Sequence, residues 1–469
     1  MPRIAQGPRN LGRRGRRSRR YSPTPHPGLS ALRGAEFFID ATLSGVSGGK
    51  LLNIGTGGSA LDAQFGSTTG TDTNDPTLLV HSGTNYLYLP GVNGNGAQVP
   101  SNAAYDITGD IELVVRANLN AQALSNAMLS KPATYRFIVD GTDATKMKVG
   151  RWSGAVWNEV SSSTGLLVTG PRWYRIRRVQ STGTCTWESA PDQTVEPTSW
   201  TSFGSAGLDP GSPFPTLGGI LEMGARDAGF GVLDGGLLRV ILRNGISGTT
   251  VLDADFTRGI TSGGQTTFTE SSSNAATVTI NRSTSGRKSV AVVRNVLLLG
   301  TDDYLEVADN ALLDFDGTGN ETMLVIMRQW GTPVASAAFM SKRDTAAAVG
   351  PNWGMIQFGS AFAVSVQAGN GVNFQTLDFA APTWAAGALT SVAAVRSVAA
   401  VTPYVNGTAG TPQSFTTAAG DMTNAVNMRI GRHTTGGNVI DMEFVAAAVF
   451  RRALTAAEIA SIVAYYQAA

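Results

Sequence analysis

The sequence predicts an all-β protein of two tandem antiparallel β-sandwiches, preceded by an extended basic arm and closed by a short C-terminal α-helix. Three observations predict this. The chain has 469 residues, it contains 56 glycines with only 15% charged residues, and one series of phrases occurs twice along it. Such a length exceeds one ordinary domain. Many glycines with few charges favour short strands joined by tight turns.

Residues 1–35 form the predicted arm. They contain nine arginines, and the first acidic residue is Glu36. Three prolines in YSPTPHPG favour an extended path and exclude a long helix. Without those nine arginines, 27 basic residues face 34 acidic ones, so a basic arm precedes a mildly acidic body.

The arm is predicted to insert into an acidic protein partner during assembly, because arginine forks suit fixed carboxylates. A basic arm could also bind phosphates non-specifically. No folded nucleic-acid-binding motif follows it, which favours protein over nucleic acid as the partner. The contact residues predicted for assembly are Arg13, Arg14, Arg16, Arg17, Arg19 and Arg20.

The repeated phrases divide the rest of the chain into a first unit, 36–247, and a second unit, 248–469. The phrase SGG at 47–49 returns at 262–264, each time after an apolar stretch with an aspartate. Further matches keep the same order: TNYLYLPG with DDYLEVAD, GDIELVVR with ETMLVIMR, Ser130-Lys131 with Ser341-Lys342, and Asp234 with Asp441. Conserved order with slowly drifting spacing indicates a tandem duplication with loop insertions.

Each unit has the pattern of a two-sheet sandwich. Segments such as IELVVRAN and TSVAAVRS are short, apolar and bounded by turn residues. Hairpin dipeptides occur at Asp140-Gly141, Asn244-Gly245 and Asn406-Gly407. Two antiparallel sheets packed face to face bury such strands.

One helix is predicted, at the C-terminus. Thr455 and Glu458 form a capping box. The apolar residues after them recur at helical spacing and fall on one face, namely Ile459, Ile462, Val463 and Tyr466. We expect this helix to lie against the second sandwich.

Three stretches carry a resemblance to a known family. They are WYRIRRVQSTGTCTWESAPD at 173–192, LRVILRNGISGTTVLDADFTRG at 238–259 and QTTFTESSSNAATVTI at 265–280. They are similar to the laminin-G-like, concanavalin A-like jelly rolls of minor tail proteins in bacteriophages that infect actinobacteria. VFRRALTAAEIASIVAYY resembles the usual close of a laminin-G-like domain. The resemblance covers roughly residues 36–469 and implies two tandem jelly-roll sandwiches.

The resemblance also implies a function. It indicates a structural, non-enzymatic protein of the extracellular phage particle, in the tail tip or a fibre, assembled in the host cytoplasm. Its implied partners are other virion proteins, further copies of itself, taken as a trimer, and a host cell-wall glycan. Two alternatives stay open: a carbohydrate-binding or carbohydrate-active protein of the same fold, and a capsid-associated protein whose arm contacts virion protein or DNA. No apolar run long enough for a membrane span occurs, so no membrane partner is expected.

Candidate sites are few. No catalytic residue is predicted, because the E-x-D-x-x-E pattern of hydrolases with this fold and the G-x-S-x-G elbow are both absent. Asp314, Asp316 and Asn320, with Glu321 beside them, offer clustered oxygen ligands for calcium. The same stretch is typical of an acidic turn, which we favour. No cofactor is therefore predicted, with calcium as the alternative.

Trp152 and Trp157 are the candidate glycan-binding residues. They flank Ser-Gly-Ala and would stand at or near a hairpin tip. Sugars stack on exposed tryptophan faces, whereas core packing explains most tryptophans, and we favour packing for the group as a whole.

Overall fold

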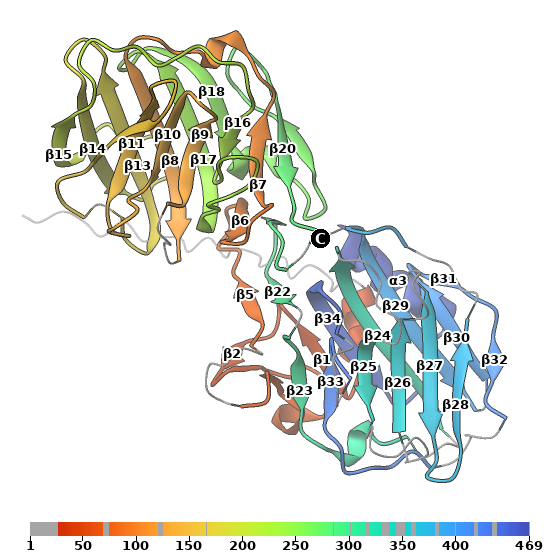
Figure 1. The fold of residues 1–469 in the computed structure, drawn as a ribbon. Helices are drawn as coiled ribbons and strands as arrows, with labels where there is room; N and C mark the ends of the chain where they lie inside the picture. The colour runs from red at the N-terminus through yellow and green to blue at the C-terminus, as the bar shows by residue number, and fades with distance from the viewer. Residues whose placement is uncertain are drawn as a thin grey trace, which may run out of the picture.

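The computed structural model describes residues 27–468 except 69–74, 121–124, 166, 285, 301, 316–318, 331–336, 344–351, 358–362, 380–383, 399, 417–420 and 434–438. Four antiparallel sheets form two sandwiches (Figure 1). The predicted all-β class, the two sandwiches and the C-terminal helix are confirmed. We name each sheet after one of its central strands.

The first sandwich packs the β8 sheet against the β10 sheet. In spatial order the β8 sheet contains β15 (Thr201–Gly207), β14 (Thr184–Pro191), β13 (Gly170–Val179), β8 (Ile111–Leu119), β17 (Asp234–Asn244), β6 (Tyr86–Pro90) and β21 (Val290–Val292), with β18 (Thr249–Asp255) also paired to β17. The β10 sheet contains β12 (Trp157–Ser161), β11 (Met147–Trp152), β10 (Tyr135–Val139), β9 (Ala127–Lys131), β16 (Leu221–Met223), β7 (Gly96–Val99), β20 (Thr277–Asn281) and β19 (Thr267–Thr269).

The second sandwich packs the β24 sheet against the β26 sheet. The β24 sheet contains β31 (Thr408–Ala409), β30 (Ala400–Val405), β29 (Leu389–Ser397), β24 (Asn320–Gln329), β34 (Met442–Phe450), β22 (Val296–Leu299) and β5 (Thr77–Leu79), with β1 (Phe37–Asp40) paired to β34 and β32 (Gln413–Ser414) to β30. The β26 sheet contains β2 (Val46–Ser47), β3 (Lys50–Leu51), β4 (Ala63–Phe65), β23 (Leu305–Val307), β33 (Met428–Ile430), β25 (Ala338–Lys342), β26 (Asn352–Gln357), β27 (Val364–Gly369) and β28 (Phe374–Asp378).

The helices are short. The α-helices are α1 (Pro27–Leu32), α2 (Phe256–Gly259) and α3 (Ala456–Ala468), and the 3₁₀ turns are η1 (Gly58–Leu61), η2 (Ala103–Tyr105) and η3 (Ala311–Leu313). In the part of the chain that the structure describes, none of the helices has the length and apolar character that crossing a membrane requires.

The two sandwiches have the same strand arrangement, down to a shared irregularity. In the first, Leu238 bulges where β17 meets β8, between Leu237 and Arg239. In the second, Val445 bulges at the corresponding point where β34 meets β24. A β-bulge inserts one residue and bends the strand, so it is a specific feature of a fold. Its repetition agrees with the tandem repeat in the sequence.

The strand pairing places the sandwich boundaries differently from the predicted 36–247 and 248–469. Residues 37–79 belong to the second sandwich, where β1 pairs with β34, β4 with β23 and β5 with β22. Residues 249–292 belong to the first, where β18 pairs with β17, β20 with β7 and β21 with β6. Each sequence unit thus gives its first segment to the other unit's sandwich.

The two exchanged segments are structurally equivalent. Asp40 ends β1 and accepts hydrogen bonds from the Thr42 and Leu43 amides, at 2.7 and 2.9 Å. Asp255 ends β18 and accepts from the Thr257 amide at 3.0 Å. Sequence similarity identified the repeat correctly, but it could not identify the sheet that each segment completes, because both sheets offer the same pairing edge.

The exchange makes the first sandwich a continuous insertion, residues 86–292, in the second one. The connections are residues 80–85 and 293–295, and they run side by side, since the His81 amide donates to Asn295 Oδ1 at 2.7 Å. In Figure 1 the first sandwich accordingly stands apart from the second at these connections.

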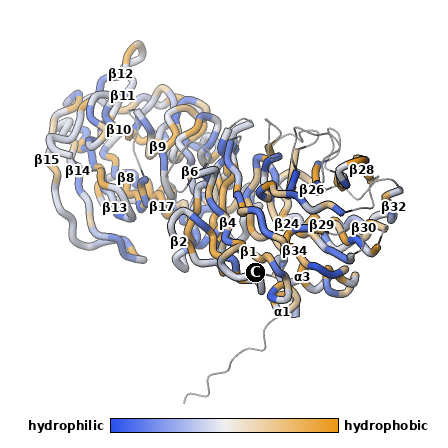
Figure 2. Tube along the Cα trace, turned by 90° about the horizontal axis from the view of Figure 1, so that it is seen from below, coloured by the Kyte–Doolittle hydropathy of each residue, from blue (hydrophilic) through white to orange (hydrophobic). Residues whose placement is uncertain are grey.

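Each sandwich has its own apolar core. The second has an additional apolar layer outside it, which also contains Tyr88 and Val290 of the first sandwich. Residues of α1 and α3 pack on the outer face of the β24 sheet, where Leu324, Ile326 and Ala448 are buried against Ile459 and Ile462. The helices α1 and α3 lie side by side (Figure 2). The predicted position of α3 is confirmed.

The predicted arm needs one correction, because its last part is helical rather than extended. Pro27 is the first residue of α1, a position at which the backbone N–H that proline lacks would have no partner within the helix. Leu32 is fully buried in the layer between the helices and the sheet. The six arginines predicted for assembly lie outside the described residues.

Candidate functional site

The calcium candidate Asp314 lies against a buried lysine. It is the C-cap residue that directly follows η3. Its carboxylate accepts a hydrogen bond from Lys342 Nζ, which also pairs with Asp309 at 2.7 Å and donates to the Asn424 carbonyl at 2.6 Å. The Lys342 side chain is fully buried. A buried ammonium needs such partners, because an isolated charge in the core is very costly.

The first sandwich repeats this arrangement. Lys131 Nζ, also fully buried, pairs with Asp106 at 2.5 Å and bonds to the Leu217 carbonyl. Asp106 is the C-cap residue of η2, just as Asp314 is that of η3. A pair present at equivalent positions in both sandwiches is explained by the fold itself. Asp314 therefore has a structural role that requires no metal.

The neighbouring candidates have partners too. Glu321 pairs with Arg396 at 2.6 Å inside the second sandwich, and Asn320 Oδ1 accepts from the Val398 amide at 3.1 Å. Asp316 lies outside the described residues. A cavity of about 150 Å³ adjoins these side chains. Among the described residues there is no cluster of three or more His, Cys, Asp or Glu that could hold a metal ion.

The glycan candidates meet on an edge hairpin. Trp152 and Trp157 are register partners on β11 and β12, and their ring centroids are 5.5 Å apart in an edge-to-face arrangement. The Arg136 guanidinium lies 4.1 Å above the Trp157 ring and also bonds to Glu159 at 2.6 Å. Both tryptophans are half-buried. This hairpin, rather than the core, is where the structure places them.

The hairpin ends in an exposed apolar tip. Val156, directly before Trp157, is 59% exposed. The equivalent hairpin of the second sandwich, between β27 and β28, has Val372 at its tip, 74% exposed, followed by Phe374. The Arg343 guanidinium lies 4.7 Å above Phe374. An exposed valine followed by an arginine-covered ring is thus common to both sandwiches, whereas the tryptophan pair occurs only on the first.

A second surface, which the sequence analysis missed, is the outer face of the β8 sheet. Arginines on it bind carboxylates in close pairs. Those pairs are Arg116 with Asp192, Arg239 with Asp253, Arg243 with Glu112 and Glu196, and Glu188 with both Arg175 and Arg177. The signal was present as polar residues at alternate strand positions, because i and i+2 share a face. The apolar residues of these strands predicted the sandwich, whereas the polar residues between them were not used to predict a charged face.

The loop between β14 and β15 folds over part of this face. Trp173 Nε1 donates to the Gln193 carbonyl at 2.9 Å, and Arg175 lies 4.4 Å above the Trp200 ring. Trp173 is completely buried. The face is therefore an ordered, charge-paired surface.

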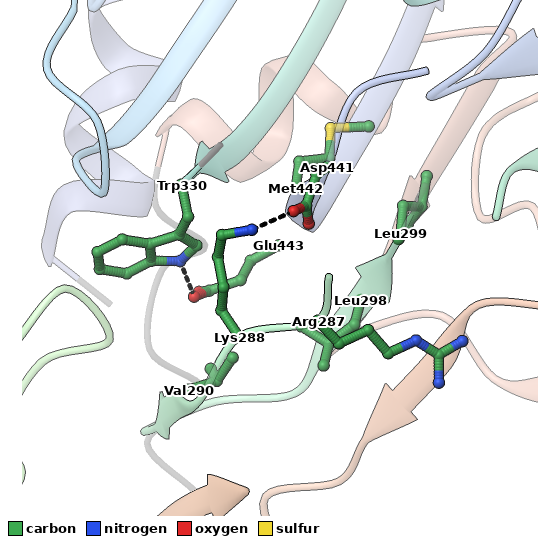
Figure 3. A pocket seen from close by; sticks show the side chains of 10 residues that line it. Arg287, Lys288, Val290, Leu298, Leu299, Trp330, Asp441, Met442 and Glu443 are labelled. Atoms are coloured by element: carbon green, nitrogen blue, oxygen red, sulfur yellow. Dashed lines mark hydrogen bonds and ion pairs between the residues drawn. The ribbon is translucent and has the colours of Figure 1, made fainter. Parts of the chain in front are cut away.

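The joint between the sandwiches contains a small cavity lined by charged and apolar residues (Figure 3). Lys288 of the first sandwich pairs with Asp441 of the second, and Figure 3 shows them pointing toward each other. Trp330 Nε1 donates to Glu443, while the Arg282 guanidinium lies 4.0 Å above the Trp330 ring. Burial lowers the pKa of Arg282 to about 10 and raises the pKa of Asp441 above its ordinary value. These contacts fix the joint.

The charged face of the β8 sheet does not have the carboxylate arrangement of a retaining glycosidase. Retaining glycosidases need two carboxylates about 5 Å apart that are available to substrate. The acids on the β8 face are instead bound to guanidinium groups. Cys185 is buried, and burial raises the pKa of its thiol to about 12, so it is not a nucleophile near neutral pH.

Comparison with known proteins supports the fold. The family model described as "Concanavalin A-like lectin/glucanases superfamily" matches residues 299–460, most of the second sandwich. The chain thus has a concanavalin A-like, laminin-G-like domain there, in agreement with part of the predicted resemblance. No curated protein matches the chain.

Several solved structures are similar to part of this chain at low identity. The binding domain of Paraclostridial Mosquitocidal Protein 1 is 10% identical, with a TM-score of 0.32, over 44% of this chain and 51% of that one. A putative carbohydrate binding protein from Bacteroides ovatus is 10% identical, with a TM-score of 0.32, over 42% and 58%. Domain 4 of the arabinanase AbnA from Geobacillus stearothermophilus is 13% identical, with a TM-score of 0.29, over 36% and 77%.

The present chain spans about half the length of the first of these structures. At such identities and TM-scores the likenesses carry no argument about a ligand.

Proposed function

We propose that this chain is a non-enzymatic structural protein of a bacteriophage particle, of the minor tail protein kind, and that it works by contact. The observation that carries the proposal is that the described charged residues bind one another in ion pairs. Lys131, Lys342, Arg116 and Arg239 hold carboxylates in pairs that stabilise the sandwiches. Because these side chains are already paired with each other, we expect the surfaces to act by binding and not through a reactive centre. The sequence resemblance to actinobacteriophage tail proteins supports the viral setting.

The arm would attach the protein to an acidic surface of the particle. Its nine arginines precede a body in which acidic residues exceed basic ones. Many copies on one particle would make weak individual contacts effective, because linked sites raise the local concentration.

The proposal is tested on particles of the phage that encodes the chain. Quantitative mass spectrometry of separated tails and filled heads should find the protein in the tails. Deleting residues 1–26 leaves α1 in place and should remove the protein from the tails. Its loss from filled heads alone would instead support the alternative of a capsid protein whose arm contacts DNA. Absence of the full-length protein from purified particles would contradict the proposal.

A glycan-binding role of the first sandwich is the second candidate, favoured by the Trp152–Trp157 pair beside the exposed Val156. We expect full-length protein to bind host cell-wall fragments, and Trp157→Ala to weaken binding at least tenfold, as loss of a stacked ring does. The matched control is Phe374→Ala on the equivalent hairpin of the second sandwich, which should leave binding unchanged. Binding that survives Trp157→Ala would exclude this hairpin as the site.

A carbohydrate-active enzyme of the same fold is the remaining alternative. Release of reducing sugar from those same cell-wall fragments by the purified protein would support it and contradict the non-enzymatic proposal.

A further inference from the structure

Both ends of the described chain lie in the second sandwich. The Glu36 amide bonds to the Val449 carbonyl at 3.1 Å, and Tyr466 of α3 donates its hydroxyl hydrogen to Asp40 Oδ2 at 2.6 Å. The helix α1, which follows the arm directly, packs on α3 at Gly28, where a side chain would overlap the Ser461 carbonyl. The point from which the arm leaves is therefore fixed to this sandwich.

Two adjacent connections join the first sandwich to the second. On the second sandwich, Leu79 and Val296 are register partners at the ends of β5 and β22. On the first, Tyr86 and Val292 are register partners at the ends of β6 and β21. Each sandwich therefore has all of its strands when the chain is cut between these pairs.

The joint between the two combines an apolar contact with polar pairs. Tyr88 and Val290 of the first sandwich are buried in one apolar cluster with Leu298 of the second. Lys288 pairs with Asp441, and Arg287 reaches both Asp303 and Thr77, at 3.0 and 2.9 Å. Each sandwich still has its own apolar core, so the joint resembles a contact between separate domains more than a shared core.

The two sandwiches also differ on the outer faces of their equivalent sheets. The helices α1 and α3 occupy the outer face of the β24 sheet, whereas the equivalent β8 face carries charged pairs whose side chains are between 1% and 31% exposed. The β11–β12 hairpin lies on the part of the first sandwich that is remote from α1 and α3 (Figure 2).

From this nesting we infer a base and a head. The second sandwich with the arm is the base, which attaches to an acidic protein surface. The first sandwich, residues 86–292, is a head that folds by itself and can be removed or exchanged without disturbing the base. The attachment role rests on the proposed function, whereas the independent folding of the two parts does not.

The test replaces residues 80–295 with Asn-Gly, a dipeptide that favours the tight hairpin needed to join the paired ends of β5 and β22. This headless chain and the isolated head, 86–292, should each show β-rich circular dichroism and one cooperative unfolding transition. The matched control replaces residues 67–295, which also removes β5. It leaves β22 without that partner strand and should lose cooperative unfolding.

The particle supplies the second readout. The headless chain should enter particles in the same copy number as the full chain, and the isolated head should not enter. An unfolded headless chain would overturn the inference. So would a folded headless chain that is excluded from particles that accept the full chain. If the full chain itself is absent from particles, the proposed function fails, while the folding result still decides the nesting.

Discussion

The two sandwiches share one topology but differ on the outer faces of equivalent sheets. Where β24 places Ile326 under the helices, β8 places Arg116 in a pair with Asp192. Where β34 has Ala446 and Phe450, β17 has Arg239 and Arg243. The inward positions stay apolar in both, such as Val115 and Val325.

The comparison separates two kinds of information. The inward residues, the bulge and the buried lysine pair specify the sandwich, because they recur in both copies. The outward residues decide what covers each sheet: two helices in the second sandwich, and paired charges with a folded loop in the first. A fold can therefore be duplicated while one face of each copy takes a separate role.

The largest expected effect comes from exchanging residues between the two faces. Ile326→Arg puts a guanidinium under α1 and α3, at a position 1% exposed. It should lower the free energy of unfolding by about 4 kcal/mol or more, because a buried charge without a partner is very costly. Urea denaturation measures the effect.

The reciprocal change, Arg116→Ile, removes an ion pair in which the arginine side chain is 7% exposed and the Asp192 side chain 31% exposed, so the carboxylate left behind still reaches solvent. It should cost about 2 kcal/mol or less, as the loss of hydrogen bonds to a charged group does. Equal costs for the two substitutions would show that the faces are not distinguished as described.

The buried lysines should behave alike in both copies. Lys131→Met and Lys342→Met each leave a carboxylate, Asp106 or Asp314, without its ammonium partner. We expect each to lower the free energy of unfolding by about 3 kcal/mol, the lower end for a broken buried pair.

Adding calcium provides a second test of the role of Lys342 and Asp314. If Asp314 is a metal ligand rather than a structural partner, calcium would raise the melting temperature of the wild-type protein. A structural pair predicts no shift, and it predicts that Lys342→Met is not rescued by calcium.

The smallest effect concerns α3, which has no counterpart among the described residues of the first sandwich. A hydrogen bond from Arg452, together with those from Thr455, lowers the pKa of Glu458 from 4.5 to about 2. Because the folded pKa is lowered, this stabilisation is complete above pH 4.5 and is lost as pH falls toward 2. The side chain is partly exposed, so the contribution should stay below about 1 kcal/mol. Glu458→Gln should flatten stability over that pH range, and an unchanged pH profile would contradict the assignment.

The sequence predicted much of the fold, for physical reasons that particular residues make plain. Thr455 and Glu458 defined the helix because a capping box is local chemistry. Ser130-Lys131 and Ser341-Lys342 aligned because each lysine is buried and forms an equivalent ion pair with an aspartate of its own sandwich. The exchange of segments was not predictable, because residues 37–79 and 249–292 fit either sandwich and only long-range pairing selects one.

The candidate site was less accessible to sequence. The pairing of the calcium candidate Asp314 with Lys342 could not be foreseen, because the two residues are distant along the chain. The charged β8 face depends on pairs such as Arg116–Asp192, which come together only across strands. Trp152 and Trp157 were correctly placed near a hairpin tip, because the turn between them is short.

Co-expression of residues 1–247 with residues 248–469 tests the central claim, that the two units complete each other, most directly. Each fragment holds strands that the other's sandwich needs. We predict that neither fragment folds alone, and that together they purify as a 1:1 complex which unfolds like the intact chain. Two fragments that each fold as stable, separate monomers would contradict the account.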